Sequence, residues 1–453
     1  MELNDMTQHI DELHAKRDIK ALKHYLNELN PADIAQLLEE IEDERKRIFF
    51  FRLLTKENAA ETFVEFDSDT QENLISAFSD AELKEVLDEL YADDAADIVE
   101  EMPASVVKRI LKNTDLETRK TINTLLKYPD DSAGSIMTTE FVDLKRDMTV
   151  EDAFKRIRRT GVDKETIYTC YITDASRHLL GVTTVKELLL HDYDDLIEEF
   201  METNVISVNT LDDQEKASGL LQKYDFLALP VVDMENRLVG IITIDDALDV
   251  LQEENTEDIH KMNAIVRTSE KPYLKIGVFD TWKSRIPWLM LLMISATFTG
   301  MIITGFEDKL SAMIVLTAFI PMLMDTGGNS GSQASTMIIR GMAVGEVEPA
   351  DILKVMWKEI RVGMLCGLSL ALVNFVRLMI QYPGQVLICL TVVISLFCTV
   401  IIAKTIGCVL PIAAKTIHLD PAIMASPMIT TIVDACSLMI YFQLACHLLN
   451  MKA

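Results

Sequence analysis

The sequence predicts a multidomain membrane protein, in which a helical N-terminal domain, a tandem α/β module and a connecting helix precede a five-helix transmembrane domain. Up to residue 283 the chain holds 62 Asp and Glu against 33 Lys and Arg, whereas the remainder holds 9 acids and 10 bases. That remainder contains five apolar stretches, each long enough to cross about 30 Å of hydrocarbon. Before it, near residue 131, a purely helical pattern gives way to short strands alternating with helices.

Residues 1–130 are predicted to form an acidic domain made of helices. Apolar residues recur at three- and four-residue spacing in residues 34–41 and 83–90. Residues 31–38 and 94–100 have similar sequences, which is typical of short helices stacked in a superhelical array. Most acids here are expected on a solvated face. One cluster is also a candidate cation site, and it consists of Asp93, Asp94 and Asp97.

Residues 131–250 are predicted to contain two copies of a compact α/β unit of about 60 residues. Each copy has strand-like runs and a following helix; the first has a turn around Gly181, and the last run of the second begins at Gly240. This order resembles paired CBS domains, which commonly bind adenine nucleotides such as ATP, with an acid after the last strand meeting the ribose. Glu187 in the first unit and Asp245 or Asp246 in the second stand near those positions, although a glutamate departs from the usual aspartate. The alternative is a structural or cation-responsive module.

Residues 251–283 are assigned to a connecting helix between the soluble domains and the membrane. The stretch from residue 249 to 260 can be helical, because no Gly or Pro follows it before Pro272. Its position favours a lever that links the acidic domains to the membrane domain. The alternative is a solvated connector.

The transmembrane domain is assigned to residues 284–453. Its five spans are predicted at residues 286–306, 311–340, 355–380, 386–403 and 421–449. Basic residues gather at the ends that share a side with the N-terminus, which places the acidic domains in the cytoplasm of a multi-pass cell-membrane protein. The acidic start of the chain argues against a cleaved signal peptide.

The cysteines and histidines of the chain lack metal-ligand spacing, so oxygen ligands and a hard ion such as Mg²⁺ are favoured.

Asp434 lies in the middle of the last predicted span. A carboxylate at that depth costs about 2.5–3.5 kcal/mol, so it is expected to face a polar pathway. The alternative is a carboxylate paired with a base or an amide inside the bundle. No base lies deep in any predicted span, which favours the pathway.

The second span contains an unusual run at residues 321–333. Pro321 and three glycines are expected to break or distort the helix, and freed carbonyls at membrane depth are tolerated only where they are buried or line a wet cavity. Such carbonyls, together with Asn329 and Gln333, would suit a cation that keeps most of its water, as Mg²⁺ does. The alternative is a packing kink. A second kink is expected at Pro427.

The ordered combination of these parts resembles the MgtE family of magnesium transporters and channels over essentially the whole chain. The resemblance is carried by the domain order, by Gly327, Gly328, Asn329 and Gln333 within residues 327–333, and by Asp434. It implies a homodimer in the lipid membrane with a pore between the subunits, in which the fifth-span aspartate holds hydrated Mg²⁺. It also implies that Mg²⁺ binding to cytoplasmic acids closes the pore.

Further ion-binding residues follow from the same resemblance. The candidate sensor ligands on the connecting helix are Asp249, Glu253, Glu254, Glu257 and Asp258. Asp420, at the inner mouth of the fifth span, is a candidate bridge between the membrane and soluble parts. Asp325, just before the glycines, is unusual and would add charge to the pathway.

The leading hypothesis is therefore a Mg²⁺-selective channel or transporter for magnesium uptake, gated by intracellular Mg²⁺. One alternative is transport of another divalent ion, Mn²⁺ or Co²⁺, by the same oxygen-based route. A different class is a membrane-anchored CBS nucleotide sensor without transport. No GxxxxGK[ST] loop or comparable catalytic constellation occurs, which disfavours a phosphoryl-transfer enzyme, and no enzyme is expected. A nucleic-acid partner is not expected either.

Overall fold

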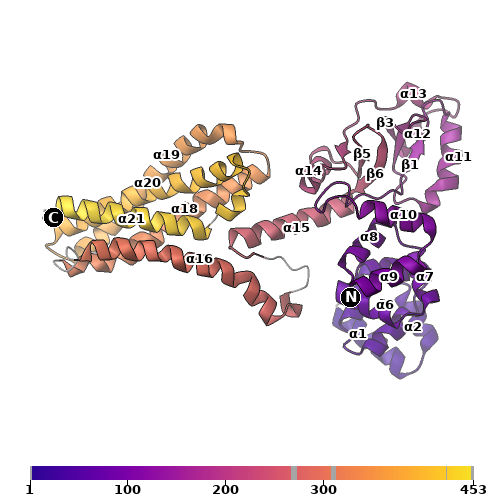
Figure 1. The fold of residues 1–453 in the computed structure, drawn as a ribbon, viewed down its shortest axis with the longest axis horizontal. Helices are drawn as coiled ribbons and strands as arrows, with labels where there is room; N and C mark the ends of the chain where they lie inside the picture. Colours follow the sequence, from indigo (N-terminus) through magenta and orange to yellow (C-terminus); the bar gives the residue numbers. More distant parts are fainter. Residues whose placement is uncertain (1–2, 267–272, 308–312, 425, 450–453) are drawn as a thin grey trace. The chain divides into compact units, whose positions relative to one another are not determined.

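The structure is a computed structural model that describes residues 3–266, 273–307, 313–424 and 426–449 (Figure 1). The chain divides into two compact units, residues 1–252 and 253–453. Each unit has its own apolar core. The division falls within helix α15, Ile244–Met262, which therefore contributes residues to both units.

Short capped helices build the first part of unit 1. These are α1 (Leu3–Ala15), α2 (Ile19–Leu26), α3 (Pro31–Glu39), α4 (Glu44–Phe51), α5 (Lys56–Val64), α6 (Ser68–Ala77), α7 (Asp80–Leu87), α8 (Ala92–Glu101), α9 (Ala104–Asn113) and α10 (Leu116–Leu125). Side chains such as Asp43 and Asp67 accept hydrogen bonds from the first free backbone amides of their helices. Ser79 and Glu82 form a complete capping box at the start of α7. The predicted helical N-terminal domain is confirmed.

The apolar spacing read from the sequence marks the core of this helical part. Ile34, Leu37 and Leu38 on α3 and Leu83 on α7 are all fully buried. They belong to one continuous cluster that also includes residues of the following α/β module, such as Leu229. The helical part and the module therefore share a core within unit 1.

The second part of unit 1 contains two similar α/β repeats, as predicted. The first has β1 (Val142–Leu144), α11 (Val150–Thr160), β2 (Thr169–Thr173), β3 (Leu179–Thr184), α12 (Val185–Leu190) and α13 (Ile197–Phe200). The second has β4 (Val208–Asn209), α14 (Gln214–Tyr224), β5 (Ala228–Val232), β6 (Leu238–Thr243) and then α15. In each three-stranded sheet the first strand pairs parallel with the second, and the second pairs antiparallel with the third.

The connecting segment differs from its prediction. Helix α15 begins directly after β6, as the last helix of the second repeat, and ends at Met262. Residues 267–272 of the predicted connector lie outside the described residues. A new helix, α16 (Val278–Gly305), begins well before the predicted first span. A single connecting helix over residues 251–283 is therefore wrong beyond Met262.

Unit 2 is a bundle of long helices. After α16 come η3 (Ile314–Phe319), α18 (Ile320–Ala343), α19 (Ile352–Gln381), α20 (Val386–Thr416), η5 (Pro421–Met424) and α21 (Ser426–Leu448). Within the described residues, α16, α19, α20 and α21 are long and apolar enough to cross a membrane. Helix α18 is also 24 residues long, but its Gly, Ser, Asn and Gln residues make it less apolar. Residues 311–312 of the predicted second span lie outside the described residues.

Helix α18 corrects the expectation of a broken span. It runs unbroken through all three glycines, and Pro321 lies in its first turn, where the missing amide removes no helical hydrogen bond. Backbone carbonyls inside a continuous helix are engaged in its own hydrogen bonds. Pro427 likewise lies in the first turn of α21, so the predicted kink there is also wrong. Both prolines start helices rather than interrupting them.

The glycines of α18 serve close helix packing. A Cβ at Gly327 would lie 2.9 Å from side chains of Thr399 on α20 and Val433 on α21. At the next crossing, a Cβ on Gly407 of α20 would lie 2.2 Å from the backbone oxygen of Gly331. Because a backbone atom cannot rotate away, only glycine fits at Gly407.

Helix α20 is longer than predicted. It continues to Thr416 instead of ending at residue 403, so Lys404 lies inside the helix and is only 5% exposed. The inference that no base lies deep in any span is therefore wrong. A lysine can be buried along its aliphatic stem, whereas the hydropathy reading ended the span at the first charge.

Candidate ion-binding sites

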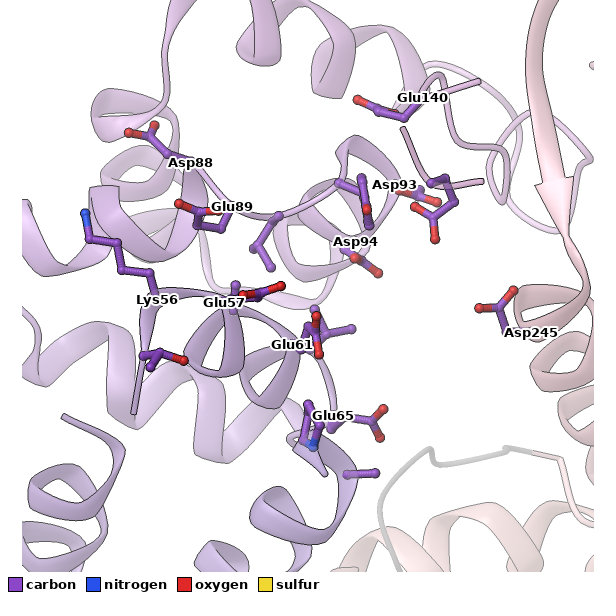
Figure 2. A pocket seen from close by; sticks show the side chains of 18 of the residues that line it. Lys56, Glu57, Glu61, Glu65, Asp88, Glu89, Asp93, Asp94, Glu140 and Asp245 are labelled. Carbon is purple, nitrogen blue, oxygen red and sulfur yellow. The ribbon is translucent and has the colours of Figure 1, made fainter. Parts of the chain in front are cut away.

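Unit 1 contains a pocket of about 1190 Å³ whose charged lining is almost entirely acidic. Figure 2 shows these side chains gathered around the opening from several elements. The acids that line it are Glu57, Glu61, Glu65, Asp88, Glu89, Asp93, Asp94, Glu140, Glu165, Asp245 and Asp246. Lys56 also lines the pocket, and its ammonium pairs with Glu85 at 3.4 Å. We call this site the acidic pocket.

Helix α8 supplies Asp93, the most deeply buried acid of the acidic pocket, and its neighbour Asp94. Asp93 and Asp94 lie in its first turn, where the helix dipole favours negative charge. Asp93 is 7% exposed, and its Oδ1 has no hydrogen-bond partner among the described residues. Burial, followed by repulsion from nearby carboxylates, raises the pKa of Asp93 well above its usual value and that of Asp94 to about 7. Neither carboxylate forms an ion pair with a base in the described part of the chain.

The first turn of α15 forms another wall of the acidic pocket, and the side chain of Asp245 is visible there in Figure 2. The hydroxyl of Thr243 donates a hydrogen bond to Asp246. Burial raises the pKa of Asp246 to about 6, although this hydrogen bond acts in the opposite direction. The structure therefore places Asp245 and Asp246, which were predicted near a nucleotide ribose, among the acids of this pocket.

Several pocket acids were missed by the sequence reading. Glu57 and Glu61 on α5 and Glu65, the residue that caps its end, recur every four residues and line the pocket. That spacing marks one helix face and was a usable signal. Glu140 and Glu165 come from the first α/β repeat, and no local pattern singles them out. Burial and then repulsion by Asp94 raise the pKa of Glu165 to about 8.

The acidic pocket is chemically suited to hydrated divalent cations. No group of three His, Cys, Asp or Glu within the described ranges is close enough to form a ready-made metal site. Mg²⁺ binds oxygen ligands but releases its water reluctantly, so it can be held by carboxylates through its own water shell. A cation there would relieve the repulsion that raises these pKa values.

The other predicted sensor acids are spread along α8 and α15. Asp97 lies on the exposed face of α8. Asp249 is exposed, and its charge repels that of Glu65 of the acidic pocket. Glu253 is exposed and Glu254 is partly buried, and both belong to unit 2.

Within unit 2, the end of α15 is joined to the segment before α21 through a lysine. The ammonium of Lys261 pairs with Glu257 at 2.7 Å and with Asp420 at 2.8 Å. Asp258 is half-buried beside them, and burial followed by repulsion from Asp420 raises its pKa. Burial would lower the pKa of Lys261, but its bonds to Asp420 and Glu257 outweigh that effect and raise it. We call these four residues the lysine junction.

Asp434 lies on α21 and is partly buried. Asp325 on α18 is close enough for its carboxylate to repel that of Asp434. The glycines explain this closeness, since a Cβ at Gly328 would lie 3.0 Å from the side chain of Thr430, one turn before Asp434. No ion pair of Asp434 with a base occurs among the residues that the structure describes. The two carboxylates of the membrane domain therefore lie near each other where α18 packs against α21.

Asp325 also belongs to a polar stripe on α18. Asp325, Asn329 and Gln333 recur every four residues on its exposed side, and the amide of Asn329 donates to Asp325 at 3.2 Å. All three line a cavity of about 520 Å³, together with Lys404 of α20. We call this the stripe cavity. It brings together three of the residues predicted for the ion pathway.

Comparison with known proteins identifies the chain. Residues 320–444 match the family described as "Divalent cation transporter", residues 29–131 match the "MgtE intracellular N domain", and residues 133–194 and 197–253 match CBS domains. A protein from Thermus thermophilus named "Magnesium transporter MgtE" is 36% identical over 437 residues, which cover 96% of each chain. The chain belongs to the MgtE family. A Bacillus subtilis protein of the same name is 32% identical over 94% of each chain.

Solved structures agree with the MgtE family membership of unit 1. The "Crystal structure of the soluble part of a magnesium transporter" has a TM-score of 0.52 and 30% identity, and covers 56% of this chain and 99% of that one. A second structure, the "cytosolic domain of the Mg2+ channel MgtE in complex with ATP", has a TM-score of 0.52 and 36% identity over 54% of this chain and 99% of that one. The chain is thus a multi-pass membrane protein with its soluble N-terminal part in the cytoplasm.

Glu187 occupies the place in the first CBS repeat that Asp246 occupies in the second. Its backbone amide donates to the hydroxyl of Thr184 at 3.2 Å, and the hydroxyl of Thr183 donates to its carboxylate at 3.4 Å. In both repeats a threonine at the strand end therefore holds the acid of the following helix. Glu187 is partly exposed at this position.

Proposed function

We propose that this protein is a Mg²⁺-selective channel or transporter that takes up magnesium, and that intracellular Mg²⁺ bound in its acidic cytoplasmic part closes the pathway. Support comes from the two relatives named as magnesium transporters, which match nearly the full length of the chain. Support also comes from the carboxylate and amide oxygens that dominate the polar lining of the candidate sites, because hard oxygen ligands suit Mg²⁺.

The observation that carries the proposal is the environment of Asp434. A partly buried carboxylate on a membrane helix, repelled by Asp325 and paired with no base among the described residues, is costly unless a cation visits it. The polar stripe on α18 extends from Asp325 along the same helix. In this proposal two copies of the chain form the pore between them, and Asp434 binds Mg²⁺ that keeps its water.

Gating is proposed to arise from the acidic pocket. Without Mg²⁺ its carboxylates repel one another, which favours a looser arrangement of the helical domain and the second CBS repeat. Bound Mg²⁺ offsets that repulsion and shifts the population toward a compact, closed form. Asp93, with a buried oxygen that lacks a partner among the described residues, is the group with the most to gain from such an ion.

Mg²⁺ uptake into proteoliposomes tests the pathway. Asp434→Asn keeps the size of the side chain but removes its charge, so uptake is expected to fall by about tenfold or more at equal protein content, on the basis of one lost charge in a weakly screened site. Asp351→Asn is the matched control, because Asp351 caps a short helix and pairs with Lys354 outside the stripe cavity. Unchanged uptake by Asp434→Asn would reject the pathway. Competition by Mn²⁺ and Co²⁺ in the same assay measures the selectivity.

ATP is proposed as a regulator that binds the CBS pair. The support is the relative whose cytosolic domain was solved with ATP, together with the paired threonine–acid positions at Glu187 and Asp246. Binding of a fluorescent ATP analogue to the full chain, with Glu187→Gln as the variant, tests this part. A saturable signal that Glu187→Gln weakens is expected, and the absence of saturable binding would reject it.

A further inference from the structure

Lys404 is the buried charge that the proposed pathway does not use. It lies inside α20, is 5% exposed and lines the stripe cavity together with Asp325, Asn329 and Gln333. In the described part of the chain it forms no ion pair within 4 Å. Burying an ammonium in a membrane domain is costly, so an unpaired one is retained only where it has a role or reaches water.

The surroundings of Lys404 fix its position. Its aliphatic stem packs near Gly363 of α19, where an added Cβ would lie 3.7 Å from the lysine Cδ. The other polar groups of the cavity are the neutral side chains Thr326, Ser330 and Ser369. The ammonium therefore shares its cavity with the same oxygen-bearing stripe that is available to a passing cation.

Three charged side chains of the bundle, Asp434, Asp325 and Lys404, are linked by proximity. Asp434 interacts with Asp325, and Asp325 lines the same cavity as Lys404. A fixed positive charge at one end weakens the hold of the carboxylates on a divalent cation, and it acts on Mg²⁺ with twice the force that it exerts on a monovalent ion. Conduction requires binding that is weak enough for the ion to leave.

We propose that Lys404 is a specificity-determining residue of the transport reaction, whose ammonium acts as a tethered cation that lowers the affinity of the α18 stripe for Mg²⁺ and so speeds ion release. This inference rests on the proposed function, because it assumes that the stripe is in the path of the transported ion. It assigns to the stripe cavity an electrostatic role distinct from binding at Asp434.

Uptake kinetics of the full-length protein in proteoliposomes test the proposal. Lys404→Gln keeps a polar side chain but removes the charge, and it is expected to lower the half-saturating Mg²⁺ concentration by about fivefold and to reduce the saturated rate. Lys404→Arg keeps the charge and should retain both values within about twofold of the unaltered protein. A merely structural role would lower the rate without tightening Mg²⁺ binding. Equal half-saturation in the Gln variant and the unaltered protein would overturn the proposal.

A second experiment measures the electrostatic potential in the stripe cavity and does not depend on transport. Cys366 lines the same cavity and is exposed, so its reaction with an anionic and a cationic methanethiosulfonate can be followed by peptide mass spectrometry in lipid nanodiscs. Lys404 is expected to favour the anionic reagent, and Lys404→Gln should reduce that preference at least about threefold, while Asp325→Asn should increase it. A preference unaffected by Lys404→Gln, or no reaction with either reagent, would overturn the proposal.

The two proposals fail in different ways. If the unaltered protein takes up no Mg²⁺, the proposed function fails regardless of Lys404. If uptake is normal but Lys404→Gln changes neither the half-saturation nor the reagent preference, only the role of Lys404 is lost.

Discussion

The acidic pocket of unit 1 and the lysine junction of unit 2 use similar carboxylates in opposite ways. In the pocket, Asp93 is buried and Asp94 half-buried beside other acids, and Lys56 at its edge is paired elsewhere with Glu85. At the junction, the ammonium of Lys261 lies between Glu257 and Asp420. Among the described residues, the one base that lines the pocket is therefore paired outside it, whereas the base of the junction lies between the acids of the junction.

This difference separates two ways of holding carboxylates together. A lysine is always present, so an arrangement held by Lys261 does not depend on the surroundings. A group of acids without a base depends on cations from solution, and its arrangement changes with their concentration. We therefore expect the pocket to respond to Mg²⁺ and the junction to be largely indifferent to it.

The pH dependence of unit 1 should show the largest effect. Burial raises the folded-state pKa values of Asp94 to about 7 and Asp246 to about 6, above the value near 4 of an unfolded chain. Between about pH 4 and 7 the folded form binds more protons than the unfolded chain. In the presence of chelator, the contribution of these two groups to the free energy of unfolding is therefore fully present below about pH 4 and is lost as the pH rises toward 7.

Hydrogen–deuterium exchange of α5 and α8 in the full-length protein measures this slope. Exchange corrected for its intrinsic pH dependence should be faster at pH 8 than at pH 6 without divalent ions. Saturating Mg²⁺ should remove most of the difference, because a bound metal replaces the missing protons. A pH slope that Mg²⁺ leaves unchanged would contradict the comparison.

Removing acids from the pocket should give the next largest effect. The double variant Asp94→Asn with Asp246→Asn is expected to raise the Mg²⁺ concentration that half-protects α5 and α8 from exchange by about tenfold, because two ligands or repulsive charges are lost. Glu12→Gln is the control, since Glu12 is exposed and pairs only with its helix neighbour Lys16 among the described residues. Equal Mg²⁺ protection in the double variant and the control would show that the pocket is not the sensor.

Removing the lysine from the junction should have a smaller effect, in which hydrogen exchange gains a response to Mg²⁺ instead of losing one. Lys261→Met leaves Glu257, Asp258 and Asp420 without their positive charge, so exchange near the end of α15 should become faster without Mg²⁺ and recover about threefold with it. Lys155→Met, which removes an exposed pairing with Glu151, serves as the control. No Mg²⁺ response in Lys261→Met would mean that charge balance does not separate the two sites.

Much of the fold could be predicted from the sequence, because local patterns determine it. The spacing of Ile34, Leu37 and Leu38 marked a helix face that is fully buried, and the two α/β repeats appeared as a repeated order of strands and turns. The span limits were less accurate. A hydropathy reading stops at a charge, so it ended the fourth span before Lys404, which the helix buries.

The sites were predictable only where their residues are close in sequence. Asp93 and Asp94 stood out as neighbours, and the four-residue spacing of Glu57 and Glu61 was available but unused. Glu165 reaches the same pocket through the packing of a different domain, which no local pattern reports. The same applies to Asp420 and Lys261, whose ion pair joins residues far apart in the chain. The ligand roles and domain limits stay predictions.

The contact between Gly331 and Gly407 limits how the membrane domain can move. An added Cβ would lie 2.2 Å from a backbone oxygen, so α18 and α20 already meet backbone to backbone at this crossing. Two helices in such contact have no side chains between them that could change rotamer and let one slide past the other. The crossing is thus a natural pivot for the bundle. Motions that widen a path for an ion would therefore have to keep α18 and α20 together at this point.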